Sequence, residues 1–403
     1  MKRKITPDAM RAIYLGSVCS FAYLAVYVVR NILSAVSPQM LEFNVLTNEM
    51  LGTLSSIFFT TYAVGQLING LIGDKLKVRY MMCGGLALAG IAGTAFAFFG
   101  HMPQIASVAY GATGFFLSMI YGPMTKMVAE NVSPLYVARC GVCYTFSSLF
   151  GSPLAGLLAM VMPWRIALYV TSFILVGVGV LCFVLFLFFE HRGIIVYNHY
   201  ERKKDEGSGI GVLLKNQIIK YTIVSILTGI VRTAVVFWLP TYIAQYLGFS
   251  VKTAALLFTV TTLVISCASF LAISVYEWLG RKQNLTVFLS FLASAICFLL
   301  LYFVKQPTAN IILITLAVLF ANCAASILWS VYCPSLRDTG MVSSATGFLD
   351  FVSYMSASIA STVFANAVSA IGWSGLILVW FGLVTIGMLV MFPITKRKGE
   401  ATC

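Results

Sequence analysis

Charge is scarce in this sequence: Asp, Glu, Lys and Arg make up only 10% of the 403 residues, whereas soluble domains carry about 25%. Hydrophobic residues make up 60%, and the mean hydropathy is +0.93. A chain with so few charges cannot cover its surface for water, which excludes a soluble globular protein and indicates a membrane protein with many spans. The basic start, residues 1–10, precedes an apolar run too long for a signal-peptide core, so we expect the N-terminus to be retained.

Side chains for metal binding and catalysis are also few. The three histidines lie at predicted loops or span ends, and the ten cysteines are scattered, mostly within apolar stretches. Cys140 and Cys143 form one CxxC pair, but a zinc site needs two further ligands and none is near in sequence. No nucleophile–base pair stands out either. We therefore expect no metal, no cofactor and no enzymatic activity.

Apolar stretches long enough to cross a bilayer, about 20 residues each, recur along the whole chain. We predict an all-α membrane protein with twelve spans: 13–36, 49–72, 80–100, 104–128, 138–162, 165–189, 218–246, 252–275, 283–304, 308–332, 341–369 and 373–394. The longest polar break divides them six and six. The predicted domains are a first six-helix bundle, a cytoplasmic linker, and a second bundle with a short tail, at 1–189, 190–217 and 218–403.

Lysine and arginine gather on one side of these spans. With the N-terminus inside, twenty lie in cytoplasmic segments or at cytoplasmic span ends, and only Arg165, Lys252 and Lys305 lie on the other side. This bias follows the positive-inside rule and predicts an inner (plasma) membrane protein with both termini in the cytoplasm. It also accounts for the net charge of +13 without a nucleic-acid partner.

Landmarks in the two halves repeat at a nearly constant separation. Arg30 and Arg232 are 202 residues apart, and Asp74 and Glu277, which end spans 2 and 8, are 203 apart. Such spacing indicates duplication of a six-helix unit. Two parallel six-helix halves are the arrangement of the major facilitator transporters, whose substrate site lies at the midplane between the halves.

The loop after span 2 resembles the signature loop of that superfamily, in which glycine and aspartate precede basic residues. An aspartate at a helix end can accept hydrogen bonds from nearby N–H groups and pair with a basic residue across a gap. We predict that this loop and its copy after span 8 form a cytoplasmic gate, with the residues Gly70, Asp74, Lys75, Arg79, Glu277 and Arg281.

Two arginines lie deep inside predicted spans. Arg30 and Arg232 each stand eight residues before a proline, Pro38 or Pro240, that marks the outer end of the span. Eight residues rise about 12 Å along a helix, which places both guanidinium groups near the midplane of a hydrocarbon core about 30 Å thick. Inserting each one costs about 2.5–3.5 kcal/mol on the translocon scale, so each requires an explanation.

The charges inside the spans favour an anion site. Asp350 is the only acid in the interior of a predicted span, so two central cations and one acid leave a net positive cavity. Guanidinium binds phosphate bidentately and keeps its proton, and two such forks match a tetrahedral dianion better than a monocarboxylate. The alternative is structural: one arginine pairs with Asp350 and the other caps backbone carbonyls.

Helical spacing selects the neighbours of these arginines. A stripe of hydroxyl groups on an otherwise apolar helix suits a wet cavity, and Ser37 and Ser225 belong to it. Trp238 could form a cavity wall or an interfacial anchor, and internal symmetry aligns the tyrosine of span 5 with the aspartate of span 11. The predicted substrate-binding residues are Arg30, Arg232, Tyr23, Tyr27, Ser34, Thr228, Trp238, Tyr144 and Asp350.

Two short stretches resemble a known family. Residues 27–38, YVVRNILSAVSP, and 231–243, VRTAVVFWLPTYI, look like the span 1 and span 7 motifs of the organophosphate:phosphate antiporters. Members of that family exchange glycerol-3-phosphate, hexose-6-phosphate or phosphoglycerate for inorganic phosphate, and the resemblance implies that Arg30 and Arg232 hold the phosphoryl group. The chain departs from familiar members at Gln66, where they carry a lysine, and in span 5, which has no histidine.

Three functions remain open from the sequence. The first is a monomeric antiporter in a lipid bilayer, with a small organic phosphate and inorganic phosphate as its partners. The second is a proton- or cation-coupled symporter of organic anions such as sugar acids, for which Asp350 is the only titratable group in the path. The third is a transporter-like sensor that binds a sugar phosphate and signals to a partner.

Overall fold

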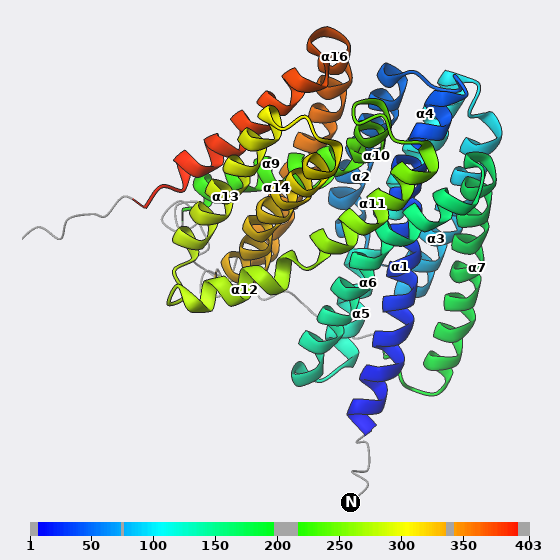
Figure 1. Cartoon of the computed structure of the whole chain (residues 1–403). Coiled ribbons are helices and arrows are strands. Elements are labelled where there is room, and N and C mark those ends of the chain that lie inside the picture. The colour runs from blue at the N-terminus through cyan, green and yellow to red at the C-terminus, as the bar shows by residue number, and fades with distance from the viewer. Residues whose placement is uncertain (1–6, 74–75, 197–216, 336–341, 394–403) are drawn as a thin grey trace, which may run out of the picture.

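The computed structural model describes residues 7–73, 76–196, 217–335 and 342–393, and within these ranges it is built from helices without strands (Figure 1). The first half contains α1 (Pro7–Glu42), α2 (Asn48–Gly73), α3 (Val78–Phe99), α4 (Pro103–Leu117), α5 (Tyr121–Asn131), α6 (Pro134–Val161) and α7 (Trp164–His191). The second half contains α9 (Ile218–Gly229), the π-helix η1 (Ile230–Val235), α10 (Val236–Gln245), α11 (Val251–Ser266), α12 (Ala268–Trp278), α13 (Gln283–Phe303), α14 (Pro307–Ile327), the π-helix η2 (Leu328–Tyr332), α15 (Cys333–Ser335) and α16 (Val342–Val390).

Predicted spans and observed helices correspond, although several spans are broken. By length and hydropathy, ten helical stretches of the described chain could cross a membrane, and α6, with 28 residues, covers the predicted fifth span. The stretch Ala345–Val390 contains two predicted spans, because α16 is interrupted at Gly372. The φ of +67° and ψ of 178° at Gly372 belong to a region that is essentially restricted to glycine. The predicted fold class, an all-α membrane protein, is confirmed.

The helices form two groups, and a few helix pairs make the contacts between the groups. Within the first group α1 packs on α6 and α3 on α7, and within the second α13 packs on α14 and α9 on α16. Between the groups, α2 packs on α16, α6 on α11, and α1 on α10. We call the end of the molecule where α1 begins the inner end, following the lysine and arginine bias, and the opposite end the outer end. In Figure 1 the lower ends of α5 and α6 separate from α12 at the inner end.

Glycines allow the two groups to approach closely. A Cβ atom on Gly52 of α2 would lie 2.5 Å from the Cβ of Ala365 on α16. A Cβ on Gly156 of α6 would lie 3.1 Å from the carbonyl oxygen of Ala255 on α11. In lipid, where apolar surface gains little from burial against another helix, such close backbone packing is a main source of helix association.

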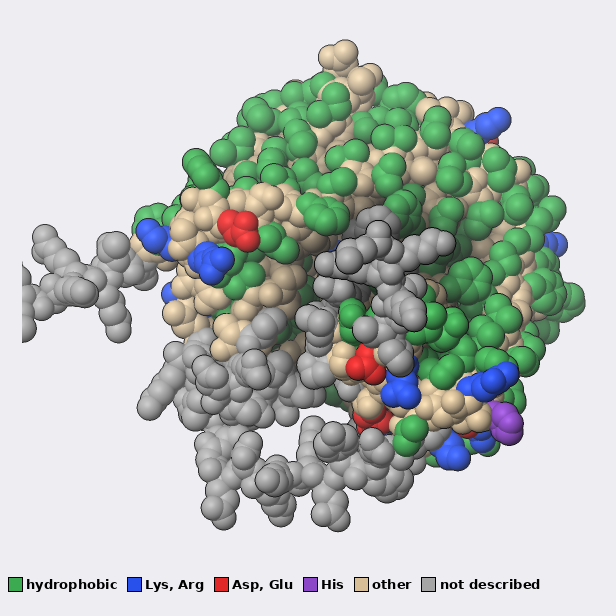
Figure 2. Space-filling view, turned by 90° about the horizontal axis from the view of Figure 1, so that it is seen from below, with side chains coloured by type: hydrophobic (Ala, Val, Ile, Leu, Met, Phe, Trp, Pro, Cys, Tyr) green, Lys and Arg blue, Asp and Glu red, His purple; other side chains and the backbone are tan. Residues whose placement is uncertain are grey.

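The outer flanks of the helices are apolar, as a lipid environment requires. Large side chains such as Trp278 (83% exposed), Val108 (74%) and Phe303 (68%) point away from the core. Figure 2, which views the inner end, shows hydrophobic side chains over most of the visible flank and charged side chains in a few small groups. Exposure on this scale is characteristic of a multi-pass membrane protein and excludes a water-covered surface.

The predicted linker lies largely outside the described residues, which omit 197–216. The part before it belongs to α7, which ends at His191, and to the turn that follows. Of the predicted gate, Asp74 and Lys75 also lie outside the described residues.

Candidate functional site

Arg30 of α1 lies in an aromatic cage that three helices build. Its guanidinium carbon is 4.8 to 6.0 Å from four ring centroids, those of Tyr27, Phe59, Tyr62 and Tyr354. These rings come from α1, α2 and α16, so both halves contribute to the cage. A cation held over ring faces away from water gains up to about 2 kcal/mol from such contacts. The cage therefore offsets part of the cost of a charge at this depth.

One hydrogen bond fixes the orientation of Arg30 in this cage. Its Nη1 donates to the hydroxyl of Tyr354 at 2.9 Å, and the Tyr354 ring packs edge-on against Tyr62 with centroids 4.9 Å apart. A guanidinium has five N–H donors. Among the described residues this is its one hydrogen bond, so its other N–H groups remain for a ligand.

Arg232 stands in a different environment. It lies half-buried on η1, a π-helix in which hydrogen bonds run from residue i to i+5. Within the described chain its guanidinium forms no hydrogen bond and no ion pair. Asp350 on α16 is near enough for its charge to interact with both arginines, but among the described residues neither forms a salt bridge with it. Since Tyr354 follows Asp350 by four residues, both belong to one face of α16.

Tyrosines extend the site along α1. Tyr23 is 8% exposed, and its ring lies 5.0 Å from that of Tyr27 and 5.5 Å from that of Tyr121. Both residues predicted here therefore belong to the aromatic region beside Arg30. Our sequence reasoning did not find four further aromatic residues: Phe59, Tyr62, Tyr121 and Tyr354. The sequence did offer a signal for Tyr354, because it stands one helical turn after Asp350. No sequence feature distinguished the aromatic residues of α2.

Several predicted cavity residues are instead engaged in helix packing. The Ser34 hydroxyl donates to the Phe237 carbonyl at 2.5 Å, and Thr228 donates to the Val224 carbonyl of its own helix at 2.7 Å. Trp238 is fully buried and packs edge-on against Trp373, with centroids 6.3 Å apart. Its ring also borders α2, because a Cβ on Gly52 would lie 3.5 Å from the Trp238 Cζ2, so the indole is buried between the two halves. Tyr144 on α6 is also buried, at 4% exposure.

The described gate residues lie at the inner ends of their own halves. Arg79 forms an ion pair with Glu190 at the end of α7, in its own half, and donates to the Tyr80 hydroxyl at 2.7 Å. Glu277 and Arg281 are exposed near the end of α12. Gly70 lies in the last turns of α2. The pairing expected across the gap, which involves Asp74, stays a prediction because Asp74 lies outside the described residues.

Hydroxyl groups join the two halves on the outer side of the arginines. Ser37 shares a hydrogen bond with Thr241 at 2.9 Å, which links α1 to α10 beside the Ser34 contact. Between α2 and α16, hydrogen bonds pair Ser55 with Ser361 at 2.8 Å, Thr60 with Ser358 at 2.6 Å, and Ser56 with Thr362 at 2.8 Å. We call this set the hydroxyl seam: Ser34, Ser37, Ser55, Ser56, Thr60, Thr241, Ser358, Ser361 and Thr362. It joins α1 to α10 and α2 to α16.

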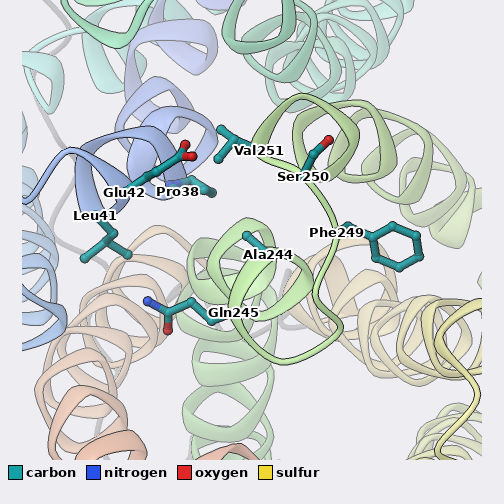
Figure 3. Close-up of a pocket in the computed structure, with 8 residues that line it drawn as sticks. All are labelled: Pro38, Leu41, Glu42, Ala244, Gln245, Phe249, Ser250 and Val251. Atoms are coloured by element: carbon teal, nitrogen blue, oxygen red, sulfur yellow. The ribbon is translucent and has the colours of Figure 1, made fainter.

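A small pocket lies beyond the seam. Its volume is about 310 Å³, and it opens between the outer ends of α1 and α10 and the start of α11 (Figure 3). The lining includes the carboxylate of Glu42 and the amide of Gln245 but no basic residue. An acid without a cation repels anions, so this pocket is an outer vestibule and not the anion site. Gln245 and Asn48 exchange hydrogen bonds of 3.3 and 3.4 Å between the halves near it.

Comparison with known proteins agrees with this architecture. The sequence model of the Major Facilitator Superfamily matches residues 19–361. The membrane sensor protein UhpC of Salmonella typhimurium is 22% identical over 93% of this chain and 90% of its own length. The phosphoglycerate transporter protein of the same organism is 22% identical over 91% and 84%, and the glucose-6-phosphate exchanger SLC37A2 of Xenopus laevis is 20% identical over 63% and 60%.

Solved structures support the fold as well. A bacterial homologue of the human lysosomal transporter Spinster, crystallised in an inward-facing, occupied conformation, superposes with a TM-score of 0.75 at 12% identity, over 94% of this chain and 96% of that one. The fold of two helical bundles is thereby confirmed. The curated relatives likewise confirm the resemblance to the organophosphate:phosphate antiporter family.

Proposed function

The chain belongs to the Major Facilitator Superfamily, and we propose that it exchanges a phosphorylated organic anion for inorganic phosphate around Arg30 and Arg232. The observation that carries the proposal is the pair of arginines, one from each half, neither of which forms a salt bridge in the described chain. Two cations and one acid give the site a net positive charge. A bound dianion would compensate that charge. A purely structural arrangement would instead provide a carboxylate for each arginine.

The chemistry of the site fits a phosphoryl group. Arg30 is held by its cage in one orientation and keeps N–H groups for a ligand, so little ordering is needed when an anion binds. Arg232 brings a second fork with no competing partner in the described chain. Charge-assisted hydrogen bonds from guanidinium to phosphate are strong and directional. An exchange cycle needs no protein proton carrier, because the anion itself carries charge between the two states.

The relatives point to the same class of substrate. One is named a phosphoglycerate transporter and another a glucose-6-phosphate exchanger, and a phosphoryl group is common to both names. We propose that this chain carries a sugar phosphate, glycerol phosphate or phosphoglycerate. It would do so as a monomer in the inner (plasma) membrane, with both termini in the cytoplasm.

A second candidate function is that of a membrane sensor. The relatives named membrane sensor protein match 93% of this chain. Such a protein would bind the same anion at the same arginines and pass the change of state to a partner. Binding without exchange is the property that separates it from a transporter.

Exchange in liposomes tests the proposal. The full-length protein is reconstituted into vesicles loaded with labelled phosphate, and release is followed after external addition of phosphate, glucose-6-phosphate, glycerol-3-phosphate, 3-phosphoglycerate or glucuronate. We expect phosphate and at least one organic phosphate, but not glucuronate, to accelerate release. The matched control is Arg165→Lys, since Arg165 lies over the Trp164 ring outside the site and should tolerate the change.

Two results would contradict exchange. Phosphate binding without accelerated release identifies a sensor. Glucuronate accumulation driven by a proton gradient, with no phosphate release, identifies a sugar-acid symporter.

A further inference from the structure

The helix that carries Arg232 is anchored to the second half before η1. Ser225 of α9 donates to the Leu349 carbonyl of α16 at 2.6 Å, and Ser356 of α16 donates to the Ile226 carbonyl at 3.1 Å. At Gly229, the last residue of α9, a Cβ atom would lie only 2.4 Å from the carbonyl oxygen of Ser353. α9 and α16 therefore move as one body up to the first residue of η1.

After η1 the same helix contacts both halves: Tyr242 of α10 donates to Asn310 of α14 in the second half, and two hydrogen bonds join α10 to the first half. The Phe237 carbonyl of α10 accepts the hydrogen bond from Ser34, and Thr241 shares one with Ser37. Both partners lie on α1. The six residues of η1 thus join a segment bound to the second half alone and a segment bound to both halves. Separation of α1 from the second half at the outer end either breaks the two hydrogen bonds to α1 or displaces α10, and a displacement of α10 acts on these six residues.

A π-helix is suited to such a joint. Each hydrogen bond of a π-helix spans one residue more than that of an α-helix. π-helical turns are rare overall, and they often occur at functional sites. Since an α-helix turns about 100° per residue, loss or migration of that extra residue rotates the flanking segments against each other by about that angle. Arg232 lies inside the joint and turns with it. Arg30, by contrast, lies on α1, which is α-helical from Pro7 to Glu42.

The two arginines also differ in their contacts. Arg30 is held by four rings and the Tyr354 hydroxyl, whereas Arg232 has no hydrogen-bond or ion-pair partner in the described chain. The internal repeat suggests equal tasks for the two residues. Their different backbones and contacts indicate different tasks.

We propose that Arg30 is the fixed docking residue for the anion, and that Arg232 is the residue through which η1 couples the bound anion to the hydroxyl seam. When the seam separates, η1 rearranges and moves Arg232 relative to Arg30. A ligand shifts an equilibrium between two states only if it interacts differently with them. Arg232 supplies that difference, while Arg30 binds the anion alike in both states. The anion part of this inference rests on the proposed function, whereas the hinge does not.

The hinge is tested without ligand. The full-length protein and the variant Ser37→Ala/Thr241→Val, which frees α10 from α1, are compared in nanodiscs by hydrogen exchange. Nitroxide labels on noncanonical residues at the exposed positions Glu49 and Lys252 report the outer distance between the halves. We expect a longer outer distance together with faster amide exchange at 230–235, and little change at 218–229. A longer distance with unchanged exchange at 230–235 overturns the hinge, and so does an unchanged distance.

The division of tasks is tested with inorganic phosphate and the matched variants Arg30→Lys and Arg232→Lys. Losing one charge-assisted hydrogen bond at Arg30 should weaken phosphate binding roughly 10- to 150-fold. Arg232→Lys should weaken phosphate binding less than Arg30→Lys, because Arg232 binds the anion in only one of the two states, but it should abolish the phosphate-dependent change in the outer distance, and with it exchange. Equal loss of affinity in both variants, with the distance change retained, overturns the division. If the unmodified protein binds no phosphate, the proposed function and the division of tasks both fail, and the ligand-free measurement still decides the hinge.

Discussion

Weakening the hydroxyl seam should shift the protein toward a state that is open at its outer end. The variant Ser37→Ala/Ser55→Ala/Thr60→Val removes one hydrogen bond between the halves at each position while keeping side chains of similar size. The bonds lost are those to Thr241, Ser361 and Ser358. All three lie on the outer side of Arg30, so their loss destabilises only the outer-closed state.

The expected size of the shift follows from these three bonds. Hydrogen bonds between membrane helices contribute on average about 0.6 kcal/mol each. Three of them give about 1.8 kcal/mol, and a tenfold change in an equilibrium constant corresponds to about 1.4 kcal/mol. The ratio of outer-open to outer-closed protein should therefore rise about 20-fold.

Pulsed electron paramagnetic resonance between labels at Glu49 and Lys252 measures this ratio. The short distance represents the outer-closed state, and the long distance represents the outer-open state. The matched control is Thr94→Val/Ser107→Ala/Thr113→Val. Each of its hydroxyls donates to a carbonyl of its own helix, at 2.7 to 2.9 Å. The reasoning is refuted if the seam variant leaves the populations unchanged, or if the control shifts them equally.

Three further outcomes are expected. Asp350→Asn removes an acid that interacts with both arginines, so calorimetry should show tighter phosphate binding. If Arg232→Gln/Asp350→Asn restores the exchange that Arg232→Gln alone loses, Asp350 has a structural pairing role instead. Asp74→Asn should slow exchange more than it weakens phosphate binding, because Asp74 belongs to the predicted gate; weakened binding with normal translocation would contradict this. Gly229→Ala should lower the melting temperature in detergent, since overpacking costs about 1–3 kcal/mol and the new Cβ would meet a carbonyl oxygen of α16 at 2.4 Å. Gly177→Ala, with nothing within 4 Å, is its control, and an equal loss in both would remove the packing argument.

The two central arginines could be found from the sequence because lipid makes charge conspicuous. Arg30 and Arg232 interrupt apolar runs, and each lies at the same distance from a proline that marks a span end. Their local environments could not be found in this way. The cage around Arg30 draws Phe59 and Tyr62 from α2 and Tyr354 from α16, and a ring on an apolar helix has no local feature that marks it as a partner of a distant cation.

The fate of the hydroxyl stripe shows the same limit. Ser34 and Ser37 share a face of α1 with Arg30, which suggested a wet cavity. In the folded chain that face meets α10 beyond the arginine, so both hydroxyls bond to the other half instead. Trp238 behaves similarly, because the direction in which α10 presents its indole depends on the turn of η1 before it.

The sequence by itself determined the membrane class, the all-α fold and the two arginines inside spans. These follow from hydropathy, charge and spacing along one helix, which lipid constrains residue by residue. Only the tertiary structure decided which faces meet, which hydroxyls join the two halves, and that Arg232 lies on a π-helical joint while Arg30 lies on a regular helix. The physical reason is that these features depend on contacts between segments hundreds of residues apart, where close packing and not local pattern selects the arrangement.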